Sequence, residues 1–376
     1  MQKLMTKTFT LLLLAMTAMG AMAGNTIKPG QLWPDTEGRH INAHGGGVLL
    51  HNGTYYWFGE HKDERTSAAM VGVTCYSSTD LVNWKNEGVA LCVSSEKGAD
   101  LERGCIIERP KVIYNAATKK FVMWFHLELR HHGYDAARFG VAVSDKPEGP
   151  YQYLYSGRAN AGKWPVEFSA QDIQRAQQLR MDDYTEWWTP QWTRAVRQGL
   201  FVKRDFEGGQ MSRDMTLYID TDGTAYHIFS SEENLTIHIA ELTPDYQHHS
   251  GRYTRLSPAG HNEAPALFKH DGTYWMITSG CTGWEPNEAR MFSAPSIWGP
   301  WTQHPNPCRG PLAEKTFGGQ STFILTIDHS PLPTYIFMAD IWRPRHPIDA
   351  RYIWLPITFN EGKPEIRWQD EWELTK

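Results

Sequence analysis

Five polar residues occupy equivalent places in a repeated pattern of this chain, and together they could perform acid–base chemistry. In four of the copies the residue stands eight positions before a turn, at the start of an apolar segment. Carboxylates that share one pocket repel one another and lose solvation, so at least one pKa should rise, as a general acid requires. Paired carboxylates with aromatic walls meet the needs of glycosidic bond cleavage. The five residues are His44, Glu108, Asp214, Glu263 and Gln320.

Each of these residues also has a purely structural interpretation. An Asp or Glu before a strand can cap a turn or pair with a neighbouring cation such as Arg109 or Arg213. Five such residues at equivalent positions favour a shared pocket over five separate structural roles.

The segments that carry these residues are hairpins rich in aromatic side chains. Apolar runs lead into Asn52-Gly53, Asp222-Gly223 and Asp271-Gly272, and aromatic runs such as Tyr55-Tyr56-Trp57-Phe58 follow. Asn-Gly and Asp-Gly tolerate positive φ at both turn positions, which favours tight β-hairpins. Two looser copies bring the number of repeats to five.

Five units of about four strands each predict an all-β fold, a five-bladed β-propeller. No Pro/Gly/Ser-rich linker divides the chain, so we expect one domain over residues 24–376. In a propeller the innermost strands begin around a central channel, so the five polar residues should meet at one face.

Residues from about 152 to 210 do not fit the repeat and predict an inter-blade insertion. Helical patterns cover residues 170–181 and 193–199. The cluster Trp187, Trp188 and Trp192 has two interpretations: a surface on which sugars stack, or packing of the insertion against the propeller.

Composition argues against several classes of partner and cofactor. The chain has 37 Lys+Arg and 42 Asp+Glu, a net charge of −5, and no basic cluster that would attract nucleic acid or anionic membrane. It lacks Cys/His metal spacing, a phosphate loop and a nucleophile-elbow motif, so we expect no metal and no cofactor. Five cysteines leave room for a disulfide such as Cys281–Cys308, but buried thiols are the favoured interpretation. We expect a monomer.

Residues 1–23 resemble a cleavable export signal. Lys3 and Lys7 precede an apolar run over residues 9–16, and Ala21-Met22-Ala23 has the small-x-small pattern of a cleavage site. No cysteine follows that site to carry a lipid anchor, and no other segment has the apolar length of a membrane span. We therefore expect a secreted or periplasmic protein without membrane insertion.

Several motifs together resemble glycoside hydrolase family 43. They are residues 43–48 leading into 53–60, residues 212–215 with 220–223, and residues 263–265, and the resemblance extends from about Leu32 to Trp372. The family consists of five-bladed propellers that hydrolyse glycosidic bonds with inversion, mainly in arabinans, xylans and galactans. The resemblance implies that Glu263 is the general acid and that Asp214 tunes its pKa and orients it.

One departure from the family pattern indicates a particular branch. Where the family usually has Asp-Pro as general base, this chain has His44-Gly45. With residues 317–322 and 108–110, this is similar to the exo-β-1,3-galactanase branch, where a fifth-blade Gln or Glu lies beside the attacking water. The general base stays open among Gln320, His44 and Glu108. The residues expected to bind substrate are Glu108, His44, Tyr134, Asn234 and Glu60.

The resemblance therefore implies a secreted inverting glycoside hydrolase that releases galactose from β-1,3-linked galactan, the backbone of plant arabinogalactan. Two alternatives stay open. An arabinofuranosidase or β-xylosidase of the same fold would normally keep the first-blade Asp, which this chain lacks. A non-catalytic carbohydrate-binding propeller would also account for the missing base.

Overall fold

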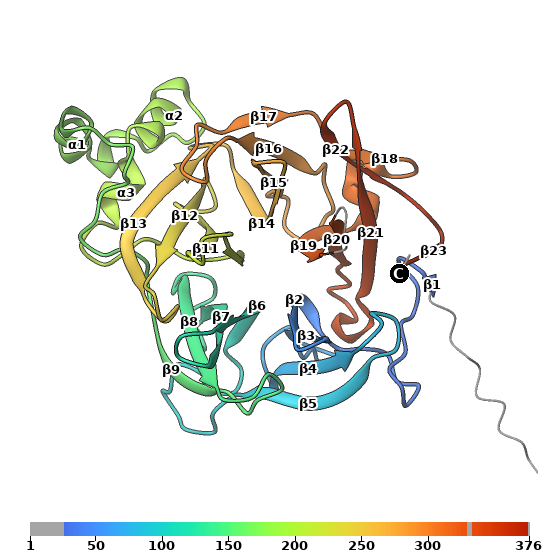
Figure 1. The fold of residues 1–376 in the computed structure, drawn as a ribbon. Helices are drawn as coiled ribbons and strands as arrows, with labels where there is room; N and C mark the ends of the chain where they lie inside the picture. The colour runs from blue at the N-terminus through green and yellow to red at the C-terminus, as the bar shows by residue number, and fades with distance from the viewer. Residues whose placement is uncertain (1–25, 329–332, 375–376) are drawn as a thin grey trace, which may run out of the picture.

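The structure, a computed structural model, describes residues 26–328 and 333–374, which form five β-sheets around a central axis (Figure 1). Four sheets have four strands and the fifth has five. Within each four-stranded sheet the strands follow one another outward from the axis in chain order, and each is antiparallel to its neighbour. The predicted five-bladed β-propeller is confirmed. The expected export signal lies outside the described residues.

The five expected polar residues, whose places are called register positions below, lie within two residues of the start of the innermost strands, and Asp214 directly precedes its strand. These strands are β2 (His44–His51), β6 (Ile106–Asn115), β10 (Met215–Ile219), β14 (Asn262–His270) and β19 (Gln320–Ile327). The remaining strands of the first four blades are β3 (Thr54–Glu60), β4 (Gly72–Ser78), β5 (Lys85–Cys92), β7 (Lys120–Glu128), β8 (Arg138–Ser144), β9 (Gln152–Gly157), β11 (Ala225–Ser231), β12 (Thr236–Leu242), β13 (His249–Leu256), β15 (Thr273–Gly280), β16 (Arg290–Ala294) and β17 (Thr302–His304).

The fifth blade joins strands from two parts of the chain. After β19 come β20 (Thr334–Ile341), β21 (Arg351–Asn360) and β22 (Lys363–Arg367), and β18 (Cys308–Arg309) adds a parallel strand at the outer edge. Outside the blades, β1 (Thr26–Ile27) pairs with β23 (Trp372–Glu373). Three short 3₁₀ helices cover Met181–Asp183, Ala313–Gly318 and Pro347–Asp349.

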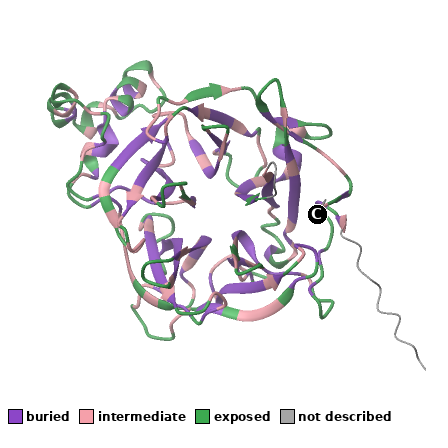
Figure 2. Ribbon diagram, viewed as in Figure 1, coloured by how far each residue is buried: buried purple, intermediate pink, exposed green. Residues whose placement is uncertain are grey.

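Aromatic side chains fill the space between the first and fifth blades. Trp57 of β3 lies 5.3 Å from Trp84 and 4.9 Å from Trp354 of β21, measured between ring centroids. All three indoles are fully buried, and each removes a large apolar surface from water. Buried residues dominate the strands around the ring (Figure 2). This packing joins the last blade to the first.

The helical insertion begins later than the sequence predicted, because residues 152–157 form β9, the outer strand of the second blade. Its helices are α1 (Ala170–Gln177), α2 (Pro190–Arg197) and α3 (Leu200–Arg204). Helix α2 starts three residues earlier than expected, since Thr189 caps it and Pro190 fits the first helical position. None of the described helices is both long and apolar enough to cross a membrane.

All five cysteines are free thiols, and Cys75, Cys105 and Cys308 are buried. The alternative of a Cys281–Cys308 disulfide is therefore wrong. Buried thiols, the favoured interpretation, describe these three residues.

A β-bulge follows the register position in four of the five blades. The extra residue of a bulge changes the direction of the strand and of the side chains beside it. The residue after the register position is left-handed in three blades, with φ of 62° at Gly45, 57° at Arg109 and 54° at Ala264. The register shifts lie between His44 and Gly47, Glu108 and Lys111, Glu263 and Ala266, and Ser321 and Phe323.

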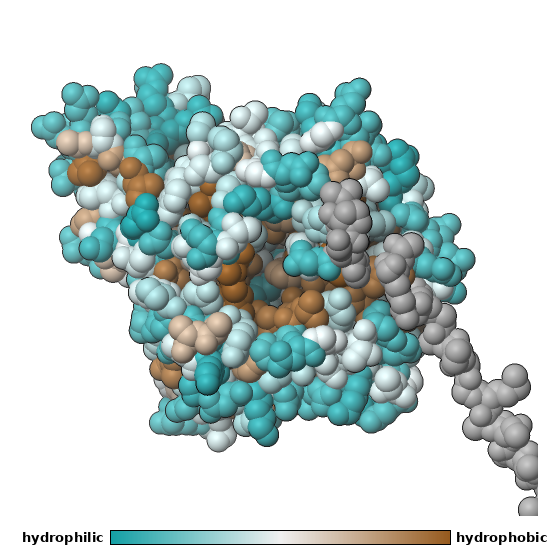
Figure 3. All heavy atoms as spheres, in the orientation of Figure 1, coloured by the Kyte–Doolittle hydropathy of each residue, from teal (hydrophilic) through white to brown (hydrophobic). Residues whose placement is uncertain are grey.

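Farther along, the same inner strands carry mostly apolar side chains. They line a cavity of about 210 Å³ whose walls include Val48, Val112, Leu217, Leu267 and Ile324. Hydrophobic side chains also surround the central depression in the face shown in Figure 3. The polar positions are thus confined to the other end of the channel, where the inner strands begin.

The bulge in the first blade predicts a strict requirement for glycine at position 46. A Cβ at Gly46 would lie 1.7 Å from the carbonyl oxygen of Phe58, so Gly46→Ala forces β2 and β3 apart. We expect the free energy of unfolding to fall by about 1–3 kcal/mol, measured by denaturant titration. Gly208→Ala is the matched control, because nothing lies within 4 Å of its added Cβ. Equal stability of the two variants would contradict this account of the bulge.

Candidate active site

A polar cavity of about 290 Å³ lies where the five inner strands begin. Seven of the eight residues expected from the sequence line it, and His44 does not. No residue of the insertion, residues 158–212, lines it. The lining residues are Glu60, Lys62, Glu108, Arg109, His126, Tyr134, Arg213, Asp214, Asn234, Glu263, Gly283, Trp284, Gln320 and Trp342.

His44 lies behind the pocket wall, which corrects its assignment as a substrate-binding residue. Its imidazole is fully buried and stacks on Tyr352 at 5.5 Å. Burial, with the nearby charge of Lys62, lowers its pKa well below the usual value, so it stays uncharged. In this blade the polar pocket position belongs to Glu60, the residue paired with His44 across β2 and β3.

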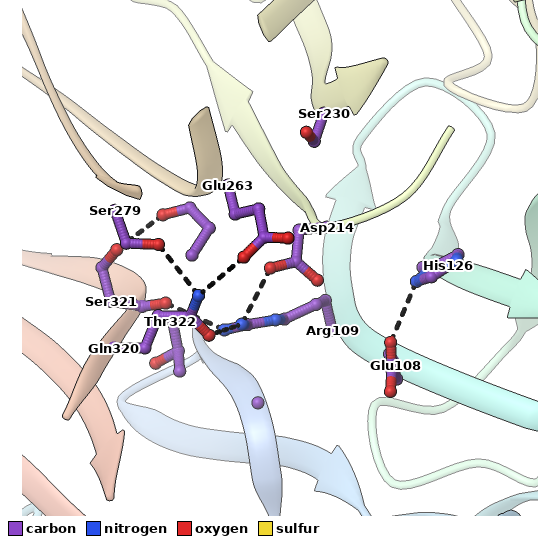
Figure 4. Close-up of polar contacts among 12 residues, drawn as sticks. Glu108, Arg109, His126, Asp214, Ser230, Glu263, Ser279, Gln320, Ser321 and Thr322 are labelled. Carbon is purple, nitrogen blue, oxygen red and sulfur yellow. Dashed lines mark hydrogen bonds and ion pairs between the residues drawn. The ribbon is translucent and has the colours of Figure 1, made fainter. Parts of the chain in front are cut away.

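Arg109 connects the polar groups of the pocket (Figure 4). Its Nη2 donates to Asp214 Oδ2 at 2.9 Å and to Gln320 Oε1. Its Nη1 donates to the Ser321 carbonyl at 2.8 Å, and its backbone N–H donates to Glu60 Oε1 at 2.9 Å. One buried side chain of the second blade therefore reaches the third and fifth blades, while its backbone reaches the first.

Glu263 is the pocket carboxyl group most suited to donating a proton. Burial and the negative charge of Asp214 raise its pKa to about 7, although Arg109 opposes the shift. Asn234 Nδ2 donates to Glu263 Oε1 at 2.8 Å, and Gln320 Nε2 lies 3.4 Å from Oε2. The raised pKa therefore lets Glu263 carry a proton near neutral pH, where an ordinary carboxyl group would be ionised.

The turn between β11 and β12 holds Asn234 against Glu263. The first three of its four residues are left-handed, with φ of 52° at Glu232, 58° at Glu233 and 61° at Asn234. Such strain persists only where the surroundings fix the conformation. Buried Arg255 Nε pairs with Glu232 at 2.7 Å, and Arg213 Nη2 pairs with Glu233 at 3.1 Å. These ion pairs set the position of the Asn234 amide.

Glu108, on the second blade, has the opposite protonation state. Burial alone would raise its pKa, but the hydrogen bond and charge of His126 and the charge of Lys62 lower it to about 2. Tyr134 OH donates to Glu108 Oε1 at 2.8 Å. Burial would lower the pKa of His126, but the carboxylates of Glu108 and Glu128 raise it to about 9. At neutral pH the pair is carboxylate and imidazolium.

Glu108, His126 and Asp214 place one potential metal-ligand atom each within 4.8 Å of one another. A histidine ligand must offer a deprotonated ring nitrogen. Here Nδ1 lies 3.1 Å from Glu108 Oε2 and Nε2 lies 2.8 Å from Glu128 Oε1. Both nitrogens face carboxylates, so a metal ion at this cluster would have to displace a proton from one of these ion pairs.

The orientation of the Gln320 amide follows from its neighbours. Oε1 accepts from Arg109 Nη2 and from Trp342 Nε1, the latter at 3.1 Å, and both groups can only donate. Nε2 donates to Ser279 Oγ at 2.8 Å. If the amide were flipped, its NH₂ group would face the N–H donors of Arg109 and Trp342. The amide oxygen therefore points toward Arg109, and the amide nitrogen points toward Glu263.

The sequence did not single out the aromatic wall, and of a second ring of polar residues it gave only Glu60. Trp342 lies 5.3 Å from the Arg109 guanidinium and 6.1 Å from Trp284. In four blades the second strand supplies the ring residue, at the position paired with the register residue. Counting eight residues forward from Asn52 and Asp271 reaches Glu60 and Ser279. The pairs are His44 with Glu60, Glu108 with His126, Glu263 with Ser279, and Gln320 with Asp340.

The comparisons with a family profile and with solved structures indicate the same family. The profile described as glycosyl hydrolases family 43 matches residues 185–330. A solved GH43 β-1,3-galactosidase, BT3683 with galactodeoxynojirimycin, is 57% identical, with a TM-score of 0.90, covering 93% of this chain and 100% of that chain.

Two exo-β-1,3-galactanase crystal structures are also similar. The enzyme from Clostridium thermocellum is 35% identical with a TM-score of 0.74, covering 92% of this chain and 66% of that chain. The enzyme from Phanerochaete chrysosporium, solved with galactose, is 32% identical with a TM-score of 0.72, covering 93% and 69%. The comparison with curated proteins gave no match.

The charges around Glu263 predict how its titration responds to substitution. We expect Glu263 to titrate near pH 7 instead of near 4.5. NMR of carbon-13-labelled glutamate carboxyl groups measures this titration. Asp214→Asn removes a negative charge that favours the protonated form, so the pKa of Glu263 should fall. Asp222→Asn, in an exposed hairpin turn, should leave it unchanged. A wild-type value near 4.5 would remove the basis for Glu263 as a proton donor.

Proposed function

The chain belongs to glycoside hydrolase family 43 and is a glycoside hydrolase, and we propose that it acts on β-1,3-linked galactan, releasing galactose from the non-reducing end with inversion. The observation that carries this proposal is Glu263, a half-buried carboxyl with a pKa of about 7 in a pocket shared with Asp214 and Gln320. The relatives named as β-1,3-galactosidase and exo-β-1,3-galactanases support the choice of substrate.

In the proposed reaction Glu263 donates its proton to the oxygen of the leaving sugar. A protonated group near pH 7 is suited to general acid catalysis at neutral pH. Asn234 orients the carboxyl through Oε1, and Asp214 keeps the proton on it by charge repulsion. Arg109 Nη2 pairs with Asp214 Oδ2 at 2.9 Å and fixes this carboxylate beside Glu263. The four residues thus divide the work of holding, orienting and releasing one proton.

We assign Gln320 to the attacking water. Its amide oxygen now accepts two hydrogen bonds, from Arg109 and Trp342, which occupy both lone pairs. To hold water, Oε1 must exchange one of these donors for the water when substrate enters. Glu108, ionised and pocket-lining, is the second candidate for the base.

The closed floor of the pocket supports exo action. Arg109 lines the polar pocket, while Lys111, two residues farther along β6, lines the apolar cavity at the other end. Both side chains are buried, and Lys111 Nζ donates to the Gly45 carbonyl at 2.8 Å. These side chains lie between the two cavities, which supports a pocket that receives the end of a glycan.

We further propose that residues 1–23 direct export of the enzyme. The support is the sequence pattern: two lysines, an apolar run and the Ala21-Met22-Ala23 site. A polysaccharide substrate fits this location, since large glycans lie outside the cytoplasm.

The proposed function predicts both the products and the effect of removing the acid. β-1,3-Galactan should yield galactose from the first time points, with the α-anomer formed first as inversion of a β-linkage requires, read by NMR. Glu263→Gln should lower kcat about 100-fold or more, and kcat/KM of the wild type should fall as pH rises through about 7, where the acid loses its proton.

A substrate with a dinitrophenyl leaving group needs no protonation, so Glu263→Gln should partly spare it. Equal loss on both substrates would make Glu263 structural. A ladder of oligosaccharides from the start would mean endo cleavage. Turnover of arabinan or xylan instead of galactan would assign a different specificity, and no turnover of any glycan would indicate a binding propeller.

The role of Gln320 predicts a contrast between two substitutions. Gln320→Ala should lower kcat about 100-fold with little change in KM, since the side chain acts on water. Gln320→Glu should keep activity, because a carboxylate accepts the proton of water more readily than an amide. Steady-state kinetics checks both. If Gln320→Ala stays active and Glu108→Gln is inactive, the base is Glu108.

A further inference from the structure

We propose that Trp187 and Trp188 of the insertion form an aromatic platform that binds the galactan chain beyond the pocket, on the side of the leaving group. The proposal rests on the proposed function and adds the binding of sugars that are not cleaved. Its occupant is the remainder of the same glycan whose terminal sugar lies in the pocket.

The topology places the insertion at the pocket end of the propeller. Each blade has four antiparallel strands from the axis outward, so the fourth strand ends at the face where the next inner strand begins. The insertion links β9 to β10, which starts beside Asp214. Residues 257–261 link β13 to β14 and lead directly to Glu263. Both segments therefore meet the surface that surrounds the pocket mouth.

The indoles of Trp187 and Trp188 lie at the protein surface and are not part of the hydrophobic core. Trp187 is 43% exposed and Trp188 55%, whereas Trp192 below them is fully buried. Trp187 stacks on Trp192 at 5.1 Å and 28° between planes, and Trp188 lies 5.1 Å from the same ring. Trp188 also has a left-handed backbone, with φ of 68°. The insertion thus supports two outward-facing rings on a rigid base.

The platform is continuous with the groups around the general acid. The Trp188 ring lies 5.0 Å from the His261 ring, two residues before Glu263. The His261 N–H donates to the Leu235 carbonyl at 3.1 Å, and neighbouring Asn234 donates to Glu263. Because the acid protonates the departing oxygen, the leaving sugar lies on the Glu263 side. The glycan leaving the pocket there runs toward His261 and Trp188.

The chemistry of the rings fits the apolar faces of pyranose sugars. Indole presents a large flat apolar surface with a polar N–H edge, and its burial against a partner contributes strongly to binding. A galactan beyond the pocket offers repeated C–H faces to such rings. The sequence left sugar stacking and internal packing both open for this cluster; the burial pattern assigns packing to Trp192, and we assign sugar stacking to Trp187 and Trp188.

The test compares a long and a short substrate in Trp188→Ala and Trp187→Ala. An aryl β-galactoside fills only the pocket, whereas β-1,3-galactan also reaches the platform. We expect the ratio of kcat/KM on galactan to kcat/KM on the aryl galactoside to fall about tenfold in Trp188→Ala. Trp188→Phe should restore part of the ratio. In the Glu263→Gln background, calorimetry should show the same loss of affinity for β-1,3-galacto-oligosaccharides.

Leu50→Ala is the matched control, since Leu50 is 45% exposed at the far end of β2 and should leave the ratio unchanged. Thermal unfolding verifies that each variant is folded. An unchanged ratio in Trp188→Ala, while the wild type cleaves galactan, would overturn the platform alone. A change of oligomeric state on gel filtration would assign the rings to a second copy and also overturn it. If the wild type cleaves no galactan, the proposed function and the platform both fail.

Discussion

A buried arginine at the centre of the propeller sets the charge balance of the pocket. Burying a guanidinium is costly unless charged and polar partners surround it. Arg109 has Asp214, Gln320 and the Ser321 carbonyl as partners of its side chain, contributed by the third and fifth blades. Its charge favours the ionised forms of Glu263 and Asp340. Arg109 therefore connects four of the blades and offsets the repulsion between neighbouring acids, while Lys62 and protonated His126 do the same beside Glu108.

The pocket keeps two carboxyl groups in opposite states because their neighbours differ. Both Glu108 and Glu263 are largely buried, which alone favours the neutral form. Glu108 faces His126, protonated between two carboxylates, and its pKa falls to about 2. Glu263 faces the charge of Asp214, and its pKa rises to about 7. Groups with separated pKa values can serve as proton donor and as fixed negative charge in one site.

Sequence periodicity was sufficient for the fold and for much of the site. Because strand pairs repeat with fixed hairpin turns, counting back from the Asp-Gly turns located Asp214 and Glu263 at the pocket, and counting back from Asp328 located Gln320. The count failed for His44, because its imidazole packs on Tyr352, a residue 308 positions away that no local pattern reveals. There the second strand supplies Glu60 instead.

Other contributors to the site leave no short-range signal in the sequence. Trp342 is brought to Gln320 by packing between elements, and the strained turn that carries Asn234 depends on Arg255, whose partner Glu232 lies 23 residues away. Such contacts follow from the assembled ring. The boundary of the insertion was also misplaced, because β9 has few buried residues and no strong strand pattern.

The insertion contributes to the acid as well as to the surface beyond it. Arg204 of α3 pairs with Glu233 at 2.7 Å, and Arg255 Nη2 donates to the Val196 carbonyl at the end of α2 at 2.7 Å. Both contacts hold the left-handed turn whose Asn234 amide touches Glu263. The propeller register thus places the carboxyl group, while the insertion fixes the amide that orients it. Because the turn before α2 in the same insertion carries Trp187 and Trp188, a glycan seated on those rings would contact the insertion that also holds the Asn234 turn in place.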